Sequence, residues 1–507
     1  MTGAAHIAPT GRWALPAQLN MAAQCLARPA DALAIIDLTG PARRDVTYGD
    51  LAGMADGLAR RLSRDVAPGD RVGVLLSQSP WCAAAHLAVW KIGAISVPLF
   101  KLFKRDALAS RVGDAGARLV LTDAEGAALL GDLARPLIAA EAGEAGPPVP
   151  TFDSTPETPA VLIYTSGTTG APKGALHGHR VLTGHLPGVS ISHNHLGQPG
   201  DCLWTPADWA WIGGLFDVLM PGLALGVPVV AARMEKFTPH GAVRIVAEGH
   251  VRNAFFPPTA LRMLKAADQP IPGLRSVASG GEPLGAEMLA WGHRAFGLTI
   301  NEFYGQTECN MVASSCAADF PPRAGCIGKP VPGHDMAVID TAGQPTQGEG
   351  DIAVRRGSAS MMLKYWNKPC QTAEKFRGDW MLTGDRGLWE GEFLRFVGRE
   401  DDVITSAGYR IGPAEIEDCL LTHPDVATVG VVGKPDALRT EIVKAYVVLK
   451  SGAQAGAEEL QSYVKDRLAS YSYPREIEFL DALPMTVTGK VIRKELKARA
   501  SAEGSKT

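Results

Sequence analysis

The sequence lacks an excess of charge of either sign. Its 50 Lys and Arg residues and 53 Asp and Glu residues give a net charge of -3 and are mixed along the chain. Proteins that bind nucleic acids usually carry a basic excess or a basic patch. We therefore expect neither nucleic acid nor another large polyanion as a partner.

Paired cysteines are missing as well. The eight Cys residues are spread over the whole chain without a CxxC pair, at positions 25, 82, 202, 309, 316, 326, 370 and 419. This spacing suggests neither a zinc site nor a disulfide framework. A reducing compartment fits best, so we expect a cytoplasmic protein.

A secretory signal and a long uninterrupted hydrophobic run are also absent. The N-terminus, MTGAAHIAPTGRW, has no basic segment followed by an apolar stretch. The most apolar window, residues 215–232, has about the length of a short membrane span but contains Asp217, Pro221 and Pro228. We interpret it as a buried strand and turn, and expect no membrane span.

Helical and strand patterns alternate through most of the first 400 residues. Residues 81–94 have helical spacing, whereas residues 95–100 and 117–123 have the pattern of strands. This alternation is typical of an α/β fold with a largely parallel sheet. The 507 residues exceed the size at which one hydrophobic core stops growing, so two or more domains are expected.

The pattern changes towards the C-terminus. Residues 441–450 alternate like a strand with one solvated face, residues 457–471 form an amphipathic helical pattern, and residues 489–500 form a basic helical end. We predict an N-terminal domain over residues 1–400 and a small α+β domain over residues 401–507.

The segment YTSGTTGAPKG, residues 164–174, follows an apolar run and precedes residues 175–186, whose pattern is compatible with a helix. Its spacing fails the P-loop pattern because Lys173 follows Pro172 instead of Gly. Its glycines nevertheless allow close approach of the backbone, and its hydroxyls and Lys173 can surround a polyphosphate. Composition alone leaves a phosphate loop and a mobile Ser/Gly turn equally open.

Five further segments occur downstream in a fixed order. They are SGGEPL (279–284), NEFYGQTE (301–308), LTGD (382–385), GREDDVITSAGYRIGPAEIE (398–417) and LPMTVTGKVIR (483–493). Together with residues 164–174, the set resembles the signature motifs of the acyl-adenylate-forming superfamily, which includes acyl-CoA synthetases. The resemblance covers most of the chain. It implies a large N-terminal domain of mixed α/β sheets with flanking helices and a small β subdomain, followed by a small mobile α+β domain.

The resemblance also implies a nucleotide site. Lys490, Glu308 and Lys173 are its catalytic residues: Lys490 bridges carboxylate and phosphate during adenylation, and Glu308 is the Mg²⁺ ligand. Asp385 takes the ribose hydroxyls, and Tyr304 stacks on the adenine. The positions implied in ATP or AMP binding are Thr165, Ser166, Gly167, Thr168, Thr169, Gly170, Lys173, Gly281, Glu282, Pro283, Glu302, Phe303, Tyr304, Gly305, Gln306, Thr307, Asp385, Arg399, Arg410 and Lys490.

A second half-reaction is implied with CoA. In the family the small domain rotates about a hinge residue, which corresponds to Asp401, before the thiol attacks the acyl-adenylate. Gly408 then leaves room for the pantetheine arm, with Ala407 and Tyr409 as its neighbours. ATP, Mg²⁺ and CoA are therefore the expected cofactors and substrates.

The acyl pocket is expected around Trp211, Ile212, Gly213 and Gly305. In members restricted to acetate, a Trp stands where this chain has Gly305 and blocks the pocket floor. The absence of this Trp implies room for several methylenes of the acid, and burying each methylene contributes about 0.8 kcal/mol of binding free energy. We expect an acid larger than propionate: medium-chain, branched or small aromatic.

Five histidines lie within a short span, at positions 177, 179, 185, 193 and 195. No Cys or carboxylate completes a set with known ligand spacing, so we favour structural roles for them over a zinc site.

Three functions remain. The leading hypothesis is an ATP-dependent acyl-CoA synthetase, acting as a monomer or homodimer. The second keeps adenylation but changes the acceptor or the follow-on reaction, as in carrier-protein loading or a lyase; the absence of an attached carrier domain favours CoA. The third is a nucleotide-binding regulator without catalysis, against which the complete set of motif residues argues.

Overall fold

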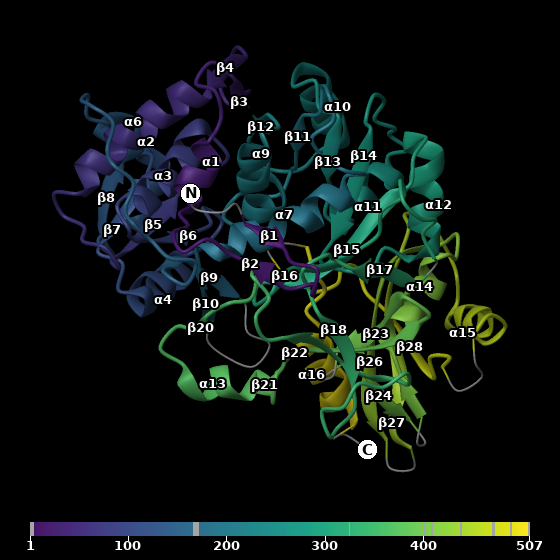
Figure 1. Ribbon diagram of the computed structural model, residues 1–507. Coiled ribbons are helices and arrows are strands. Elements are labelled where there is room, and N and C mark those ends of the chain that lie inside the picture. The colour runs from purple at the N-terminus through teal and green to yellow at the C-terminus, as the bar shows by residue number, and fades with distance from the viewer. Residues whose placement is uncertain are drawn as a thin grey trace.

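The computed structural model describes residues 5–165, 172–323, 325–399, 402–406, 409–436, 439–468, 472–486 and 489–504. Within these ranges the strands form four sheets, of two, seven, fourteen and five strands (Figure 1). The smallest sheet pairs β1 (His6–Ile7) with β2 (Trp13–Ala14). The three larger sheets and their helices contain the predicted site.

The seven-stranded sheet has the order β20-β10-β9-β6-β5-β7-β8. Its centre is parallel, because β5 pairs in parallel with β6 and β7, and β6 with β9. The strands are β5 (Arg71–Leu75), β6 (Ile95–Pro98), β7 (Leu119–Thr122), β8 (Arg135–Ile138), β9 (Pro159–Thr165), β10 (Lys173–Gly178) and β20 (Lys364–Tyr365). The strands predicted at 95–100 and 117–123 are confirmed as β6 and β7.

The fourteen-stranded sheet has the order β18-β19-β22-β23-β17-β16-β15-β14-β13-β11-β12-β3-β4, with β21 beside β22. Its run from β3 to β15 is parallel, and its run from β15 to β18 is antiparallel. The strands are β3 (Leu33–Asp37), β4 (Arg44–Thr47), β11 (Leu203–Trp204), β12 (Val229–Ala231), β13 (Asn253–Phe255), β14 (Ser276–Gly280), β15 (Ile300–Gln306), β16 (Asn310–Ser314), β17 (Cys326–Pro330), β18 (Met336–Ile339), β19 (Gly350–Arg355), β21 (Phe376–Arg377), β22 (Trp380–Glu390) and β23 (Phe393–Arg399). The predicted α/β class is confirmed.

Helices cover both of these sheets. They are α1 (Met21–Leu26), α2 (Tyr48–Leu62), α3 (Pro80–Lys91), α4 (Arg105–Ala115), α5 (Ala124–Leu130), α6 (Ala139–Ala142), α7 (Arg180–Ser192), α8 (Ile212–Gly214), η1 (Leu215–Leu219), α9 (Met220–Leu225), α10 (Pro239–Glu248), α11 (Pro258–Ala266), α12 (Gly285–Phe296) and α13 (Pro369–Glu374). The helix predicted at 81–94 is confirmed as α3. It begins where Ser79 accepts a hydrogen bond from the Cys82 amide and Pro80 occupies the first turn.

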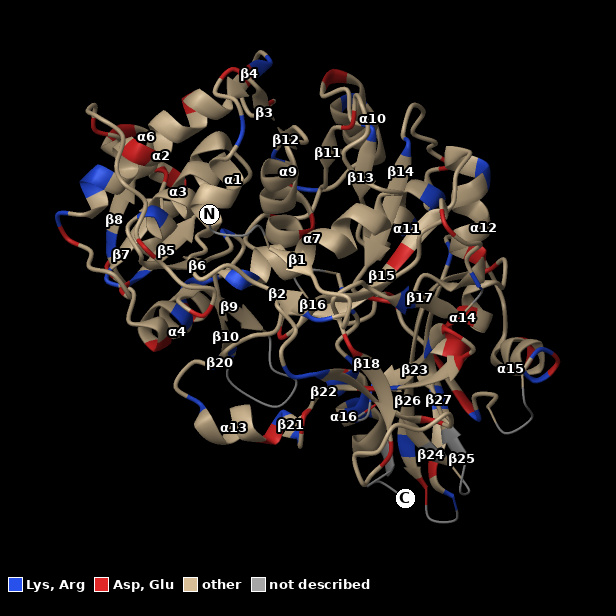
Figure 2. Cartoon of the chain, viewed as in Figure 1, with Lys and Arg blue, Asp and Glu red and all other residues tan. Residues whose placement is uncertain are grey.

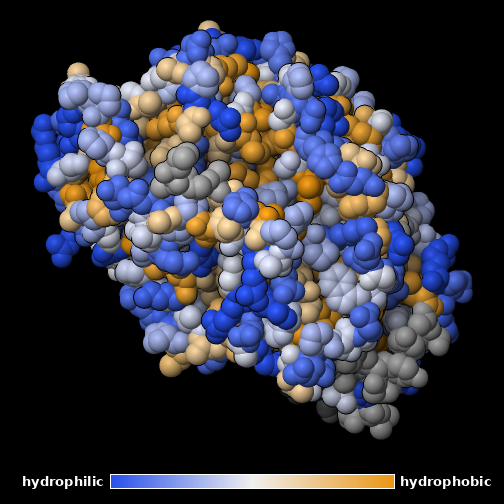
Figure 3. All heavy atoms as spheres, in the orientation of Figure 1, coloured by the Kyte–Doolittle hydropathy of each residue, from blue (hydrophilic) through white to orange (hydrophobic). Residues whose placement is uncertain are grey.

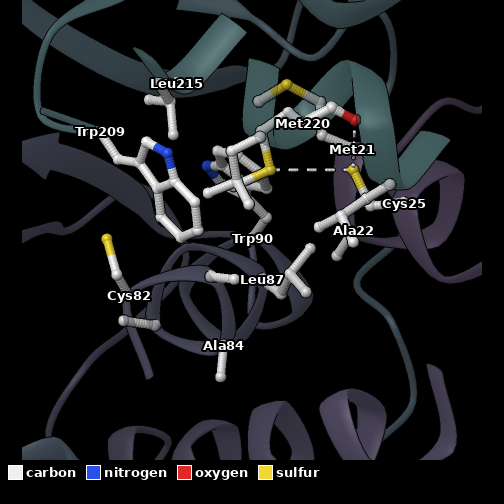
Figure 4. Close-up of a cluster of buried hydrophobic side chains, with 14 of the residues drawn as sticks. Met21, Ala22, Cys25, Cys82, Ala84, Leu87, Trp90, Trp209, Leu215 and Met220 are labelled. Atoms are coloured by element: carbon white, nitrogen blue, oxygen red, sulfur yellow. Dashed lines mark hydrogen bonds between the residues drawn. The ribbon is translucent and has the colours of Figure 1, made fainter. Parts of the chain in front are cut away.

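Helix α3 has no polar stripe, and every residue in it except Trp81 is buried. A helix that is apolar all round must be covered on all sides. It packs between α1 and α2, and the Trp90 indole donates a hydrogen bond to the Ala160 carbonyl (2.8 Å). Figure 4 shows the neighbouring sulfur atoms of Cys25 and Met220, which lie 3.9 Å apart. Through this core, the seven-stranded sheet packs against α1 and α9.

Two sequence predictions in this region were wrong in part. Residues 175–186 do not form one helix: β10 pairs with β9 up to Gly178, and α7 begins only at Arg180. Residues 215–232 contain η1 and α9 before the short strand β12. Short apolar runs fit a buried helix as well as a buried strand, and only the tertiary partner decides between them.

The five-stranded sheet lies at the lower right of Figure 1 and contains the C-terminal residues. Its order is β25-β24-β27-β26, with β28 parallel to β27. The strands and helices are β24 (Ile404–Ser406), β25 (Tyr409–Ile411), α14 (Pro413–Leu421), β26 (Val426–Asp436), β27 (Thr440–Leu449), α15 (Ala457–Lys465), β28 (Glu476–Phe479) and α16 (Arg493–Gly504). The boundary predicted between residues 400 and 401 falls on residues outside the described ranges and stays a prediction.

The strand predicted at 441–450 is β27, but its expected solvated face is wrong. Val443, Ala445 and Val447 pack with α14 and α15, whereas Tyr446 packs with α16. Both faces of β27 are therefore covered: α14 and α15 pack on one face of the five-stranded sheet, and α16 packs on the other.

The surface agrees with the mixed charge of the sequence. In Figure 2 the Lys and Arg positions and the Asp and Glu positions are interspersed along the coloured part of the cartoon. Figure 3 shows apolar side chains near the upper centre of one face, with hydrophilic side chains around them. Among the helices in the described ranges, none is both long and apolar enough to cross a bilayer.

Candidate active site

A cavity of ≈ 270 Å³ lies where the two large sheets meet the C-terminal part of the chain. Gln78 and Phe100 contribute from segments that follow β5 and β6, Gly281 from the segment that follows β14, and Lys490 from the C-terminal part. The lining segments thus follow the carboxyl ends of parallel strands, which is where open α/β sheets bind ligands. Lys490 and Gly281 place the cavity at the predicted adenylation site.

Lys490 reaches this site through a close approach to glycine. The Lys490 Nζ lies 3.6 Å from the position that a Cβ on Gly281 would take, and Gly281 has φ +103°. The preceding Gly489 accepts a hydrogen bond from the Thr259 hydroxyl (3.2 Å), which fastens the segment to α11. Burial lowers the pKa of Lys490, and the Glu282 carboxylate opposes this effect.

The predicted nucleotide residues lie on adjacent strands. β14 and β15 pair in parallel with Gly280 opposite Phe303, so Gly281, Glu282 and Pro283 leave the sheet beside the start of NEFYGQTE. Glu282 accepts a hydrogen bond from Arg262 (2.8 Å), a residue that no sequence motif indicated. The two predicted walls of the adenine slot are therefore brought together by the sheet itself.

Tyr304 and Asp385 form one unit. The Tyr304 hydroxyl donates a hydrogen bond to the Asp385 carboxylate (2.5 Å), joining β15 to β22. Asp385 also lies opposite Arg399 in the antiparallel β22–β23 pair. Burial raises the pKa of Asp385, and Arg399 opposes the shift. The carboxylate predicted to take the ribose is thus held in place from two strands.

Glu308 and Lys173 meet at a residue that the sequence did not indicate. The Tyr365 hydroxyl donates a hydrogen bond to Glu308 (2.5 Å), and the Lys173 Nζ lies 5.5 Å from the centre of the Tyr365 ring. Glu308 is only 8% exposed. Tyr365 arrives here because β20 pairs with β10, almost two hundred positions earlier in the chain. No local pattern around Tyr365 signals this contact.

Glu302, Gln306 and Thr165 bond within the protein. Glu302 accepts a hydrogen bond from the Leu284 amide (3.0 Å) before α12, Gln306 donates to the Thr383 carbonyl (2.9 Å), and the Thr165 hydroxyl donates to the Lys173 carbonyl (3.4 Å). In this structure these side chains support the site's backbone. Phe303, from the same set, lies 5.2 Å from Phe255 between ring centroids, and Thr307 is partly buried.

Several predicted residues fall outside the described ranges: Ser166, Gly167, Thr168, Thr169 and Gly170 of the phosphate loop, the hinge residue Asp401, and Ala407 and Gly408 of the CoA segment. Tyr409 and Arg410 lie in β25, of which the structure describes the backbone. Their roles stay predictions.

The predicted acyl pocket is only partly assembled. Trp211 lines the cavity and stacks on Phe255, with 5.8 Å between ring centroids. Ile212, Gly213 and Gly305 are not among the residues that line it. A Cβ on Gly213 would lie 2.4 Å from the Trp211 ring, so the indole covers this glycine.

Gly305 does not open the volume that was expected. A Cβ at this position would lie 1.8 Å from the Asn310 carbonyl oxygen. The register of β15 and β16 shifts between Tyr304 and Gly305, and Asn310 has φ +59°. This bulge brings the backbone of β16 into the space of the absent side chain. Gly305 is thus required by a close backbone approach in this structure.

Acidic groups meet where α12 and α14 approach. A Cβ on Gly285 would lie 2.9 Å from Asp418. The Asp418 carboxylate adds to the rise in the pKa of Glu302, and Glu417 adds to the rise in the pKa of Asp418. Burial raises the pKa of Glu302 to about 7 and that of Asp418 to about 7. Neither residue was assigned to this contact from the sequence.

The Asp418→Asn variant is expected to make stability less dependent on pH. Because the folded-state pKa of Asp418 is raised, the protein loses stability as pH rises from the ordinary carboxyl value of 3.8 to about 7. The amide cannot ionise, so this loss should be absent from the variant. Urea unfolding across this pH range measures it, with the exposed Asp481→Asn as control. Equal pH dependence in Asp418→Asn and the parent protein would contradict the assignment.

Two family models match the chain: the AMP-binding enzyme over residues 21–366, and the AMP-binding enzyme C-terminal domain over residues 415–490. The chain belongs to the AMP-binding enzyme family. The first match includes Lys173, Glu308 and Tyr365, and the second ends at Lys490. Membership therefore confirms the resemblance that the motifs indicated.

Relatives of this AMP-binding enzyme include enzymes with several named activities. Acetyl-coenzyme A synthetase of Bacillus subtilis (strain 168) is 33% identical over 475 residues, covering 86% of this chain and 81% of that protein. The anthranilate CoA ligase AuaEII, solved with anthranoyl-AMP, is similar with a TM-score of 0.87 and 25% identity, over 97% of this chain and 99% of that one. The amide bond synthetase McbA from Marinactinospora thermotolerans has a TM-score of 0.83 and 26% identity, over 94% and 99%.

Proposed function

We propose that this AMP-binding enzyme is an ATP-dependent acyl-CoA synthetase. It converts a carboxylic acid and ATP into an acyl-adenylate and pyrophosphate, and then transfers the acyl group to CoA with release of AMP. The observation that carries the proposal is the position of Lys490, which enters from the C-terminal part and lies against Gly281 and beside Glu282.

Adenylation requires a carboxylate to approach the negatively charged α-phosphate. The Lys490 ammonium attracts both anions, and its partial burial strengthens the interaction because little water screens it. Asp385, fixed by Tyr304, binds the ribose hydroxyls and orients the nucleotide. Positioning of this kind converts an encounter between two substrates into a reaction within one site.

The phosphate end of the nucleotide is assigned to Lys173 and the Glu308–Tyr365 pair. Glu308 is a buried carboxylate, and no Lys or Arg of the described ranges forms an ion pair with it. A buried carboxylate needs a cation or hydrogen-bond donors, and Tyr365 donates to only one of its oxygens. These residues fit Mg²⁺, which would neutralise charge on the leaving pyrophosphate. Lys173 adds a second positive charge beside the Tyr365 ring.

Thioester formation is assigned to the same cavity. The cavity is lined by Lys490 and Gly281 and also by the apolar side chains of Phe100, Leu102 and Phe237. An apolar lining of this kind suits a pantetheine arm. Rotation of the C-terminal part about Asp401 would remove Lys490 and bring Ala407, Gly408 and Tyr409 to the acyl-adenylate. The CoA thiol then attacks the acyl carbon and AMP leaves.

The acid is proposed to be larger than propionate: medium-chain, branched or small aromatic. The anthranoyl-AMP complex of a similar protein supports an aromatic acid. Trp211, Phe255 and Phe303 form an aromatic group beside the cavity.

A pyrophosphate-release assay over acetate, propionate, longer straight-chain acids, branched acids, benzoate and anthranilate tests this function. We expect AMP and pyrophosphate as products, with kcat/KM at least about tenfold higher for a larger acid than for acetate, the equivalent of about 1.4 kcal/mol of binding. Production of ADP would contradict the reaction. Preference for acetate would contradict the acid class alone.

An acceptor other than CoA is the second candidate, supported by the similarity to the amide bond synthetase McbA. The acyl-adenylate, once formed, is offered in turn to CoA, to a pantetheinylated carrier protein and to an amine. Consumption only with the carrier protein or the amine would replace CoA as the acceptor. A regulator without catalysis would give no acid-dependent pyrophosphate exchange at all.

A further inference from the structure

Three metal-binding side chains converge outside the adenylation site, at the end of α7. The His195 Nε2 lies 2.7 Å from the Asp319 carboxylate and 4.0 Å from the Cys316 Sγ. One ligand atom from each of the three residues lies within 4.8 Å of the other two. His195 is separated from Cys316 by more than a hundred positions, so no local spacing in the sequence reveals the set. By sequence spacing no Cys or carboxylate completed a ligand set with the clustered histidines, whereas in the fold Cys316 and Asp319 lie beside His195.

We infer that His195, Cys316 and Asp319 form a binding site for a divalent transition metal, with Zn²⁺ as its natural occupant. One thiolate, one imidazole and one carboxylate are a ligand set for Zn²⁺, with water in the fourth position. Typical bond lengths of about 2.3 Å to sulfur and 2.0 Å to nitrogen place these two ligands about 3.5 Å apart in a tetrahedral site. The observed 4.0 Å between Nε2 and Sγ must shorten slightly, and the 2.7 Å between Nε2 and the Asp319 carboxylate must lengthen to about 3.3 Å, for the ion to bind between them.

The geometry distinguishes a metal site from a catalytic Cys–His–Asp relay. In a relay the two ring nitrogens act separately: one takes the proton from the nucleophile and the other bonds the carboxylate. Here Nε2 faces both Cys316 and Asp319. A cation bound to Nε2 can also reach the sulfur and the carboxylate oxygen, because the three ligand atoms lie within 4.8 Å of one another.

The backbone that presents His195 is held from several sides. Asn194 and His195 both have positive φ, +53° and +61°. Arg275 donates hydrogen bonds to the carbonyls of His193 (3.0 Å) and Asn194 (2.9 Å), and Asn301 donates to the Asn194 side chain (2.9 Å). The imidazole is therefore positioned before a metal arrives, which reduces the entropy lost on binding.

Access and ligand chemistry favour a particular class of ion. The side chains of His195 and Asp319 are 49% and 46% exposed, so an ion can enter from solvent, whereas Cys316 is buried behind them. Thiolate and imidazole ligands favour Zn²⁺ and related transition metals over Mg²⁺ and Ca²⁺. On binding, the Cys316 thiol loses its proton to solvent as the metal–sulfur bond forms. No change of oxidation state is involved.

The bound ion would connect the segment that follows helix α7 to the segment that follows strand β16 of the fourteen-stranded sheet. His195 follows α7, and Cys316 and Asp319 follow β16, the strand that packs against α7. A cross-link between them closes a long section of the chain. It would stabilise the folded protein without touching the adenylation residues.

Cobalt binding tests the proposal in the full-length protein. We expect Co²⁺ to bind at one equivalent with a sulfur-to-cobalt charge-transfer band, and Zn²⁺ to displace it and raise the melting temperature by several degrees. Cys316→Ser should remove the band, and His195→Ala and Asp319→Asn should each weaken Zn²⁺ binding at least about tenfold. The exposed Cys370→Ser and His240→Ala are the matched controls and should leave binding unchanged.

Three results would overturn the site: no charge-transfer band with the parent protein, a band that survives Cys316→Ser, or an equal loss of Zn²⁺ affinity in the control variants. Excess Mg²⁺ should not compete, and competition by Mg²⁺ would show that the ligand class is wrong. Far-UV circular dichroism of Asp319→Asn, in which the replaced side chain is half exposed, verifies that lost affinity does not reflect unfolding.

Discussion

Replacing Lys490 with alanine is expected to lower acid-dependent pyrophosphate exchange by about 10²–10³-fold, the usual cost of removing one preorganised charge stabiliser. The ammonium group lies beside Gly281 and Glu282, where the carboxylate of the acid and the α-phosphate of ATP must come together. Among the described residues that line the cavity, Lys101 is the one other lysine, and it is paired with Asp123 and Glu125. Exchange between labelled pyrophosphate and ATP measures the effect.

The second half-reaction distinguishes loss of chemistry from loss of folding. Transfer from a supplied acyl-adenylate to CoA should fall far less in Lys490→Ala than exchange does, because Lys490 acts in the first step. Lys494→Ala, an exposed lysine of α16, is the control and should leave both steps unchanged. Unchanged exchange in Lys490→Ala would remove the proposed role of this lysine.

The Glu308→Gln variant is expected to lower the adenylation rate about a hundredfold and to raise the Mg²⁺ concentration needed for half-maximal rate. The amide keeps the shape of the side chain and can still accept a hydrogen bond from Tyr365, but it carries no negative charge. Titration of the exchange rate with Mg²⁺ measures both effects.

Tyr365→Phe separates charge from orientation at this position. The variant keeps the Glu308 carboxylate and keeps an aromatic ring at position 365 beside Lys173. It removes only the hydroxyl that orients the carboxylate. A smaller loss, about tenfold, is expected for such a supporting contact. Glu374→Gln on α13 is an exposed control. A Mg²⁺ dependence unaltered in Glu308→Gln would exclude Glu308 as the ligand.

Much of the fold followed from local patterns. The helix α3 and the strands β6 and β7 were predicted because their apolar residues are continuous and bounded by caps and glycines. Residues 175–186 and 215–232 were assigned wrongly in part, because an apolar run of this length is stable in either conformation. Pairing of β10 with β9 decided the first, and burial of η1 and α9 in the core decided the second.

The sequence by itself determined the family, the reaction class and the charged residues expected at the adenylation site. Asp385, Lys490 and Glu308 lie in short motifs whose residues and order can be read from the sequence without any structure. The tertiary structure decided which groups support them. Tyr365 reaches Glu308, Arg262 reaches Glu282, and Asp418 reaches Glu302's neighbourhood, in each case through pairing or packing of distant segments.

Tertiary contacts also changed the meaning of two features that the sequence had presented. Gly305 was expected to leave an open pocket floor, but a bulge fills that space with the Asn310 carbonyl. His195 was expected to have a structural role and not to bind a metal, but the turn after β16 brings Cys316 and Asp319 close to it. Residue types and spacing specify the chemistry available to a segment. Only the folded chain specifies which groups share a volume, because that depends on contacts between segments far apart in sequence.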